Sequence, residues 1–122
     1  LLTRRAIEPH LGKRELPGGF SDPMETAEQA AQREIQEELG ISVHSLEYFC
    51  SFPNEYVFSG FSVFTLDLAF LAQTEQLHEM HPMDDVASFE FIKPAEIDLE
   101  ELPSISMKNF VKEIIRREGI NK

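Results

Sequence analysis

The chain has 122 residues, of which 42% are hydrophobic and 27% charged, and its formal net charge is −11. This length suits one compact domain, and the composition is that of soluble globular proteins, which excludes a disordered or fibrous chain. Its apolar stretches fall far short of the roughly 20 residues that cross a bilayer. So acidic a chain is poorly suited to coating nucleic acid, because that binding depends on Lys and Arg at phosphates. We expect a single domain over residues 1–122, cytoplasmic because a secretory signal is missing from its start, with no membrane and no nucleic acid as partner.

The first predicted element is the end of a strand near Arg4, and its abrupt beginning indicates an N-terminal truncation. Two consecutive glycines, Gly18 and Gly19, predict a turn because glycine adopts backbone conformations closed to other residues. Thr26 followed by Gln three residues later matches a capping box, so a helix should run from there to Leu39 and stop at glycine 40. One stripe of this helix should pack against a sheet; its residues are Ala27, Ala31, Ile35 and Leu39.

Segments 43–53 and 61–72 are rich in β-branched and aromatic residues, which predicts two adjacent strands, and Cys50 within the first is expected in the core. Residues 74–85 are predicted as a loop and residues 89–92 as a short strand. After Pro103, apolar residues recur at helical spacing and predict an amphipathic C-terminal helix. Strands between two helices predict an α/β fold, with a mixed sheet covered by helices on both faces as an α/β/α sandwich.

The first helix also carries Glu34, Glu37 and Glu38, which share a second stripe because they are spaced by three and four residues. Like charges at these spacings repel each other by a few tenths of a kcal/mol per pair unless a cation compensates. A solvated helix face is the usual interpretation of a Glu-rich helix. The alternative is a bound cation.

Residues 19–41 favour the cation. They contain Gly-x5-Glu-x7-Arg-Glu-Ile-x-Glu-Glu-x-Gly-Ile, which resembles the signature of the Nudix hydrolases at every specified position. The preceding Leu-Pro-Gly-Gly-Phe at residues 16–20 and Arg-Arg-Ala at residues 4–6 are similar to members that act on ADP-ribose or dinucleotides. The resemblance implies a hydrolase that uses Mg²⁺ or Mn²⁺ to cleave a pyrophosphate between a nucleoside and a second group, releasing a nucleoside monophosphate.

By motif position, the resemblance implies that Glu37 and Glu38 are the main metal ligands and that Glu34 is a ligand or the base that activates water. The Gly18 carbonyl would complete the ligand set, as carbonyl oxygens suit Mg²⁺. Glu25 would anchor the site from outside the ligands. Arg33 projects away from Glu34 around the helix, so it should fix the platform by pairing with an acid such as Glu25.

Candidate substrate contacts are less specific. Arg4 and Arg5 could grip phosphates, although surface solubility explains them equally well. Phe20, Phe52 and Tyr56 could stack on a base, as could Phe58, although burial in the core is the commoner role of aromatic residues. Many family members have a further acid just before the late strand, where this chain has Ser88; the candidate substitutes are Asp84, Asp85 and Glu79, and we favour Asp85, although the Asp pair also suits a solvated turn.

We therefore expect a metal-dependent pyrophosphohydrolase with an ADP-ribose-like or NADH-like substrate. One rival is a nucleoside triphosphate hydrolase that cleans the nucleotide pool. Another is a non-catalytic regulator that binds ADP-ribose, although such proteins can lose the signature carboxylates that this chain retains. A plain acidic structural domain is the last. The expected partner is a small nucleotide, and a homodimer is left open.

Overall fold

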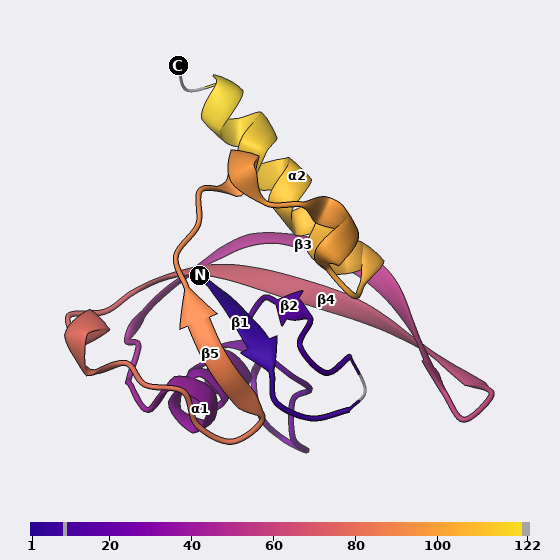
Figure 1. Cartoon of the computed structure of the whole chain (residues 1–122), viewed down its shortest axis with the longest axis horizontal. Helices are drawn as coiled ribbons and strands as arrows, with labels where there is room; N and C mark the ends of the chain where they lie inside the picture. Colours follow the sequence, from indigo (N-terminus) through magenta and orange to yellow (C-terminus); the bar gives the residue numbers. More distant parts are fainter. Residues whose placement is uncertain (9, 121–122) are drawn as a thin grey trace.

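The computed structural model describes residues 1–8 and 10–120, without the side chains of residues 58 and 120 (Figure 1). The proposed role of Phe58 therefore lies outside the described side chains. The strands are β1 (Leu2–Arg5), β2 (Arg14–Glu15), β3 (Ser45–Phe58), β4 (Phe61–Gln73) and β5 (Val86–Glu90). The α-helices are α1 (Ala27–Leu39) and α2 (Ile105–Ile120), and the 3₁₀ turns are η1 (Leu77–Glu79), η2 (Pro94–Glu96) and η3 (Leu99–Glu101).

The strands form two sheets where one mixed sheet was expected. β1 lies between β2 and β5, while β3 and β4 form a long hairpin, and these pairings are antiparallel throughout the described residues. The hairpin turns at Ser59 and Gly60, which have φ angles of 46° and 84°. Positive φ at both central residues is typical of the tight turns that match strand twist. From this turn the pairing of β3 with β4 extends back to Ser45 and Gln73, with one register shift between Tyr48 and Cys50.

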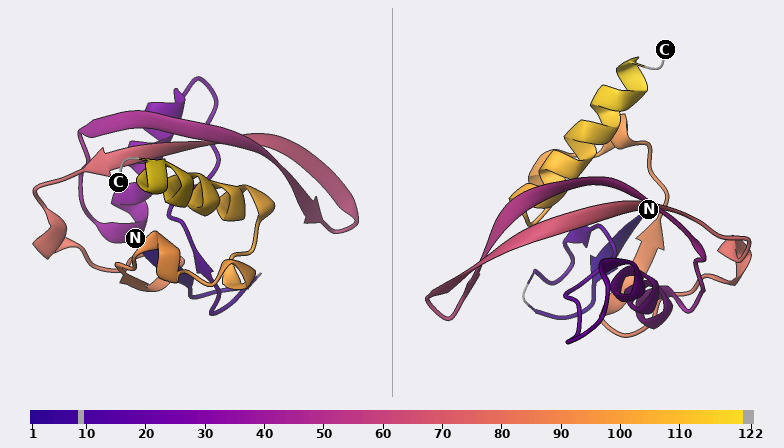
Figure 2. Two further views of the ribbon diagram at one scale, coloured as in Figure 1. Left: turned by 90° about the horizontal axis from the view of Figure 1, so that it is seen from above. Right: turned by 180° about the vertical axis from the view of Figure 1, so that it is seen from behind.

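The hairpin lies between the two helices, with α2 on one side and α1 together with the three-stranded sheet on the other (Figure 2). This arrangement confirms the α/β class. Two neighbouring residues of α2 join both sheets: Phe110 packs with Phe49 and Cys50 of β3, and Val111 packs with Leu2 of β1. Cys50 is buried, as predicted. The apolar face of α2 thus holds the hairpin and the smaller sheet together.

Helix α1 begins and ends as predicted. The Thr26 hydroxyl accepts the Gln29 N–H at 3.0 Å, the Gln29 side chain accepts the Thr26 N–H at 2.9 Å, and Gly40 closes the helix with φ of 70°. The predicted apolar stripe is only partly right, because Leu39 is fully buried while Ile35 is half-buried. Ala27 and Ala31 are half-buried as well, and Ala30 is buried instead.

The reason is that the C-terminal end of α1 is held by a loop. The His81 N–H donates to the Leu39 carbonyl at 3.1 Å, and the Met83 N–H donates to the Glu38 carbonyl at 2.8 Å. Burial therefore concentrates at Leu39. In the part of the chain that the structure describes, neither helix is long and apolar enough to cross a membrane.

Strand β5 begins at Val86, three residues earlier than predicted. Ser88 therefore lies inside the strand, opposite Arg4 of β1. The residues just before the strand are Asp84 and Asp85, and Asp84 has a positive φ of 54°. This shift places an acidic pair at the position that the resemblance assigns to a further acid.

Candidate active site

Arg33 organises the start of α1. Its guanidinium donates to both Glu25 carboxylate oxygens, at 2.8 and 3.0 Å, which confirms the expected pair. Glu25 also accepts the Asp22 N–H at 2.8 Å, and Arg33 donates to the Phe20 carbonyl at 2.9 Å. The bonds from Arg33 lower the pKa of Glu25. Because both Glu25 oxygens are engaged, this side chain suits an anchor of the loop before α1.

Arg33 also contacts the acids from which it was expected to turn away. Its Nη1 donates to Glu34 at 2.9 Å and to Glu37 at 3.2 Å. Burial nevertheless raises the pKa of Glu34, against the lowering by Arg33. The Glu34 carboxylate lies against the turn, since a Cβ added at Gly19 would meet its Oε1 at 2.6 Å. A glycine at this position is what allows Glu34 to approach the loop.

Glu38 is the most perturbed acid of the group. Its Oε2 accepts the Gly18 N–H at 3.3 Å, so the contact found at Gly18 is through the amide and not the carbonyl that the resemblance implies. Burial raises the pKa of Glu38 to about 8, and the charges of Glu34, Glu15 and Asp84 add to the rise. At neutral pH this carboxyl is therefore mostly protonated when no cation is bound.

The donor set fits a divalent cation, although the side chains are not gathered around one. Among residues 1–8 and 10–120, no three Asp, Glu, His or Cys side chains are placed to hold one metal ion together. The hydrogen bonds explain this, because Glu34 and Glu37 turn to Arg33 and Glu38 turns to Gly18. Carboxylate oxygens are the ligands that Mg²⁺ and Mn²⁺ prefer. A carboxyl whose pKa is raised by burial and by neighbouring acids, as that of Glu38 is, is the kind of group that a cation would ionise.

The two arginines that were predicted to bind phosphates have different partners. Arg5 forms an ion pair with Glu15 at 3.3 Å, and Glu15 is one of the charges acting on Glu38. Arg4 donates to the Gly12 carbonyl at 2.9 Å and lines a small pocket of about 130 Å³ with Arg14. Of these two arginines, Arg5 is the one whose ion-pair partner, Glu15, acts on a carboxyl of the signature, that of Glu38.

The other residues that were predicted to contact the substrate also lie in different surroundings. The Phe20 and Tyr56 rings meet edge to face with centroids 5.5 Å apart, and Phe20 is bonded to Arg33 through its carbonyl. Phe52 packs against Phe110 at 5.8 Å in the core, which is its commoner role. The Asp85 carbonyl accepts the Ala6 N–H at 2.7 Å. The neighbour of Asp85, Asp84, is the acid whose charge acts on Glu38.

The prediction missed a polar cluster beside Tyr56, formed by Asn54, Thr65, Asp67 and Ser106. Tyr56 donates to Asp67 at 3.2 Å, and Ser106 at the start of α2 donates to Asp67 at 2.6 Å. Part of this cluster could have been predicted, because every second residue of a strand shares a face. Asn54 and Tyr56 are two positions apart in one strand, and Thr65 and Asp67 are two positions apart in the next.

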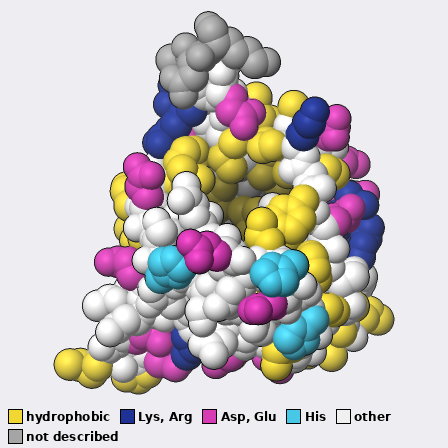
Figure 3. Space-filling model, turned by 90° about the vertical axis from the view of Figure 1, so that its left-hand side faces the viewer, with side chains coloured by type: hydrophobic (Ala, Val, Ile, Leu, Met, Phe, Trp, Pro, Cys, Tyr) yellow, Lys and Arg dark blue, Asp and Glu magenta, His cyan; other side chains and the backbone are white. Residues whose placement is uncertain are grey.

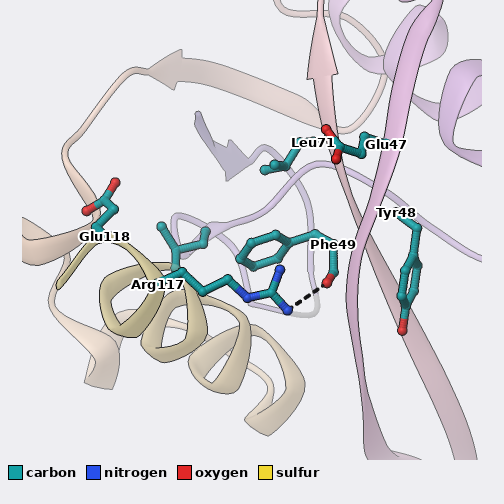
Figure 4. A pocket seen from close by; sticks show the side chains of 7 residues that line it. Glu47, Tyr48, Phe49, Leu71, Arg117 and Glu118 are labelled. Carbon is teal, nitrogen blue, oxygen red and sulfur yellow. Dashed lines mark hydrogen bonds between the residues drawn. The ribbon is translucent and has the colours of Figure 1, made fainter. Parts of the chain in front are cut away.

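A larger pocket lies away from the acids. Between α2 and the beginning of the hairpin, about 350 Å³ is enclosed by side chains that include Tyr48, Leu71 and Arg117 (Figure 4). Arg117 donates to the Phe49 carbonyl at 3.0 Å, with its guanidinium 4.1 Å from the centre of the Phe49 ring. Figure 3 shows that hydrophobic side chains also gather around a hollow on one face of the molecule. None of the predicted site residues lines the 350 Å³ pocket, so this pocket is separate from the candidate site at α1.

Comparison with known proteins agrees with the signature. The NUDIX domain matches residues 1–115. The chain is 43% identical to 8-oxo-dGTP diphosphatase of Escherichia coli over 63 residues, which are 46% of this chain and 47% of that protein. It is 37% identical to the NAD-capped RNA hydrolase NudC of Haemophilus influenzae over 100 residues, 82% of this chain and 35% of that protein. The chain thus spans half or less of these relatives.

Two solved structures share the fold. The NUDIX domain of Shewanella oneidensis NrtR, solved with ADP ribose, aligns with a TM-score of 0.65 and 19% identity over 95% of this chain and 75% of that one. The MutT NUDIX hydrolase of Burkholderia pseudomallei aligns with a TM-score of 0.58 and 23% identity over 80% of this chain and 74% of that one. With its match over residues 1–115 and the carboxylates of the signature in place on α1, this chain belongs to the NUDIX domain family.

Proposed function

We propose that residues 1–122 act as one hydrolase domain that cleaves the pyrophosphate bond of a nucleoside diphosphate joined to a second group. ADP-ribose-like and NADH-like compounds are the proposed substrates, and a nucleoside monophosphate is one product. The signature supports hydrolysis because all of its acids are retained. The relative that covers 82% of this chain is named for an NAD-containing substrate, which supports a dinucleotide-like compound.

The observation that carries the proposal is the complete set of signature acids, with the Glu38 carboxyl against the Gly18 turn, where burial and then the neighbouring acids raise its pKa. We propose that Glu37 and Glu38 hold Mg²⁺ or Mn²⁺, with Glu34 and the Gly18 carbonyl as further ligands. A bound divalent ion neutralises pyrophosphate charge and makes phosphorus more electrophilic. We propose that Glu34 takes the proton of the attacking water, since burial raises its pKa.

The remaining residues position this group. Arg33 and Glu25 fix the loop before α1, and Arg5 pairs with Glu15, whose charge acts on Glu38. Phe20 and Tyr56 offer aromatic surface next to the loop. In the proposed reaction, water attacks one phosphorus, the bridging P–O bond breaks, and the proton of the water leaves through a carboxylate.

The test is a substrate panel with Mg²⁺ and Mn²⁺ that includes NADH, ADP-ribose, diadenosine polyphosphates, sugar nucleotides, nucleoside triphosphates and NAD-capped RNA. For NADH or ADP-ribose we expect AMP and the complementary phosphorylated product. In ¹⁸O-water the label should enter a product phosphate, because phosphorus is the electrophile. Free nicotinamide, or label on ribose, would contradict the proposal.

A second candidate is hydrolysis of a nucleoside triphosphate, because the match to 8-oxo-dGTP diphosphatase has the higher identity, although it covers only 46% of this chain. Release of inorganic pyrophosphate from 8-oxo-dGTP, with dinucleotides left intact, would favour it. A cytoplasmic location and a homodimer stay predictions.

A further inference from the structure

The long hairpin has an apolar face that is open to solvent. Leu66 of β4 pairs with Pro53 of β3 and lies two positions from Phe64 and from Leu68, and alternate residues of a strand share a face. We call this face the outer face of the hairpin; its apolar residues are Pro53, Val57, Phe64, Leu66 and Leu68. All five are exposed, Phe64 to 78% and Leu66 to 65%. Apolar side chains therefore meet water along both strands.

The opposite face, which we call the inner face, is the one that α2 covers. Phe52 packs there against Phe110 of α2 with ring centres 5.8 Å apart, and the Ser106 hydroxyl at the start of α2 donates to Asp67 at 2.6 Å. Asn54 is buried on this face as well. Polar groups are thus turned toward the protein, while the alternate apolar residues are turned toward solvent. This reversal of the usual alternation indicates that another molecule covers the outer face.

The surface area of the chain agrees with this interpretation. Its accessible surface is 8032 Å². A compact monomer of 14.0 kDa exposes about 6,700 Å² by the size scaling of globular proteins, so the surplus is about 1,300 Å². A stable dimer of standard size takes roughly 800 Å² from each partner. Part of the surplus lies where the turn of the hairpin extends beyond the helices and the smaller sheet (Figures 1 and 2). The exposed area is therefore sufficient for one interface.

The charge of the outer face favours a second copy of this chain as its partner. Neither β3 nor β4 contains Lys or Arg, and the one acid of β4, Asp67, is on the inner face. Two copies with a net charge of −11 repel each other, so they can approach closely only at a face with few acids. A strongly charged partner would find no opposite charge there. Apolar contacts with few charges are typical of the centre of homodimer interfaces.

We propose that the outer face of the hairpin binds the same face of a second copy, with a two-fold axis that crosses β4 near Leu66. Two-fold dimers are the commonest closed assemblies of identical chains. This axis places Phe64 of one copy against Leu68 of the other. Because Phe64 is 78% exposed and Leu68 only 42%, a prominent side chain meets a recessed one. The proposal assigns a surface to the homodimer that the sequence leaves open, and it does not depend on the proposed hydrolysis.

The same axis keeps the acids of the interface apart. Glu55 of β3 pairs with Phe64 and is therefore two strand positions from the axis. The two Glu55 side chains of a dimer would be separated by four positions, which is about 13 Å along the strand. This distance exceeds the Debye length of about 8 Å at physiological ionic strength, so their repulsion is largely screened. The arrangement thus joins apolar residues without bringing like charges together.

Sedimentation equilibrium of the whole chain, from about 1 to 100 µM, measures the dimer, because interfaces of standard size bind in the micromolar range or more tightly. We expect the average mass to rise to twice the 14.0 kDa of one chain and to stop there, since a two-fold contact is closed. Raising NaCl from about 0.05 to about 0.5 M should preserve or strengthen the dimer, because salt screens the repulsion between acidic chains.

A matched pair of variants tests the face. Phe64→Asp places a charge on the outer face and should raise the dimer dissociation constant at least about tenfold. Phe61→Asp makes the same change on the same strand at a residue that is 76% exposed, but on the opposite face, and should leave dissociation unchanged. Circular dichroism and thermal midpoints of the separated monomers should match the wild type, because both side chains are exposed.

A pair of double variants tests the axis. Phe64→Asp combined with Leu68→Lys places opposite charges against each other in the proposed dimer and should restore part of the association, whereas Phe64→Asp with Leu68→Asp should not. Equal dissociation of the two double variants would overturn the contact at Leu66. The proposal would also be overturned by a wild-type mass that stays at 14.0 kDa, by a mass that rises without a limit, or by equal effects of Phe64→Asp and Phe61→Asp.

Discussion

The acids of the two helices differ in what surrounds them. On α2, Glu113 accepts hydrogen bonds from Arg116 and Arg117, three and four residues later, and these bonds lower its pKa to about 2. On α1, Glu38 stands four residues after Glu34, and burial with the charge of Glu34 raises its pKa to about 8. Similar spacing therefore gives opposite electrostatics, since the partner is a cation in one helix and another acid in the other.

In our proposal, this difference separates a structural ion pair on α2 from a ligand site on α1. Glu113 is neutralised by its own helix and needs nothing further. On α1, Arg33 divides its hydrogen bonds among several acceptors: two go to Glu25, one to Glu34, one to Glu37 and one to the Phe20 carbonyl. Glu38 accepts the Gly18 N–H and not a hydrogen bond from Arg33, so it is the acid of α1 suited to bind an external cation.

The largest effect should follow removal of a ligand charge. Glu37→Gln and Glu38→Gln should each lower kcat by about 100-fold or more with little effect on folding, because each removes charge from the metal site. Steady-state kinetics on the substrate found by the panel would measure this. Glu28→Gln, an exposed acid in the first turn of the same helix, and Glu113→Gln are the matched controls. Near-normal turnover of the Glu38→Gln variant would contradict the proposed functional difference between Glu38 of α1 and Glu113 of α2.

The second-largest effect should be the loss of stability when the buried side chain at the C-terminal end of α1 is shortened. Leu39→Ala should cost roughly 2–5 kcal/mol in the free energy of unfolding, because Leu39 is fully buried where α1 meets its loop. Ile35→Ala should cost less, since Ile35 is only half-buried. Urea denaturation of both variants measures the two costs. Equal losses of unfolding free energy in the two variants would contradict the difference in burial between Leu39 and Ile35.

Metal binding should stabilise the native chain. Millimolar Mg²⁺ or Mn²⁺ should raise the free energy of unfolding by about 1–3 kcal/mol through binding to the folded state, and EDTA should reverse the rise. Thermal unfolding with and without metal measures it. The shift should persist in Glu113→Gln and shrink in Glu38→Gln. A wild-type midpoint indifferent to metal, with and without substrate, would count against the cation site.

The pH dependence should be the smallest effect and should have opposite signs in the two helices. With pKa about 8 against an ordinary value of 4.5, Glu38 binds more protons folded than unfolded, so in the metal-free chain its contribution to stability falls as pH rises through that window. Glu113, with pKa about 2, contributes stability above pH 4.5 that is lost as pH falls toward 2.

The two contributions are measured as differences from variants. Urea midpoints in EDTA from about pH 5 to pH 9 should converge for wild type and Glu38→Gln at low pH and separate at high pH, the variant being the more stable. Glu113→Gln should show no such high-pH separation. A Glu38 difference that is constant with pH would place its pKa in the ordinary range.

Much of this arrangement could be predicted because it is local. The cap at Thr26, the stop at Gly40 and the pairing of Arg33 with Glu25 depend on residues a few positions apart. What could not be predicted depends on distant segments. The start of β5, and with it the place of Asp84, is set by pairing with β1 more than 80 residues away.

The backbone bonds that tie His81 and Met83 to the end of α1 also set where the chain tolerates a change in length. Thr74 and Gln76 are bonded to Ser42, so the segment between those bonds and the bonds at His81 is residues 77–80, which include η1. An insertion there would extend this turn and leave α1 untouched. An insertion between residues 83 and 86 would instead displace Asp84 from Glu38, because both of its flanks are bonded. Among natural variants and engineered chains, loop length should therefore vary before His81 and stay constant after Met83.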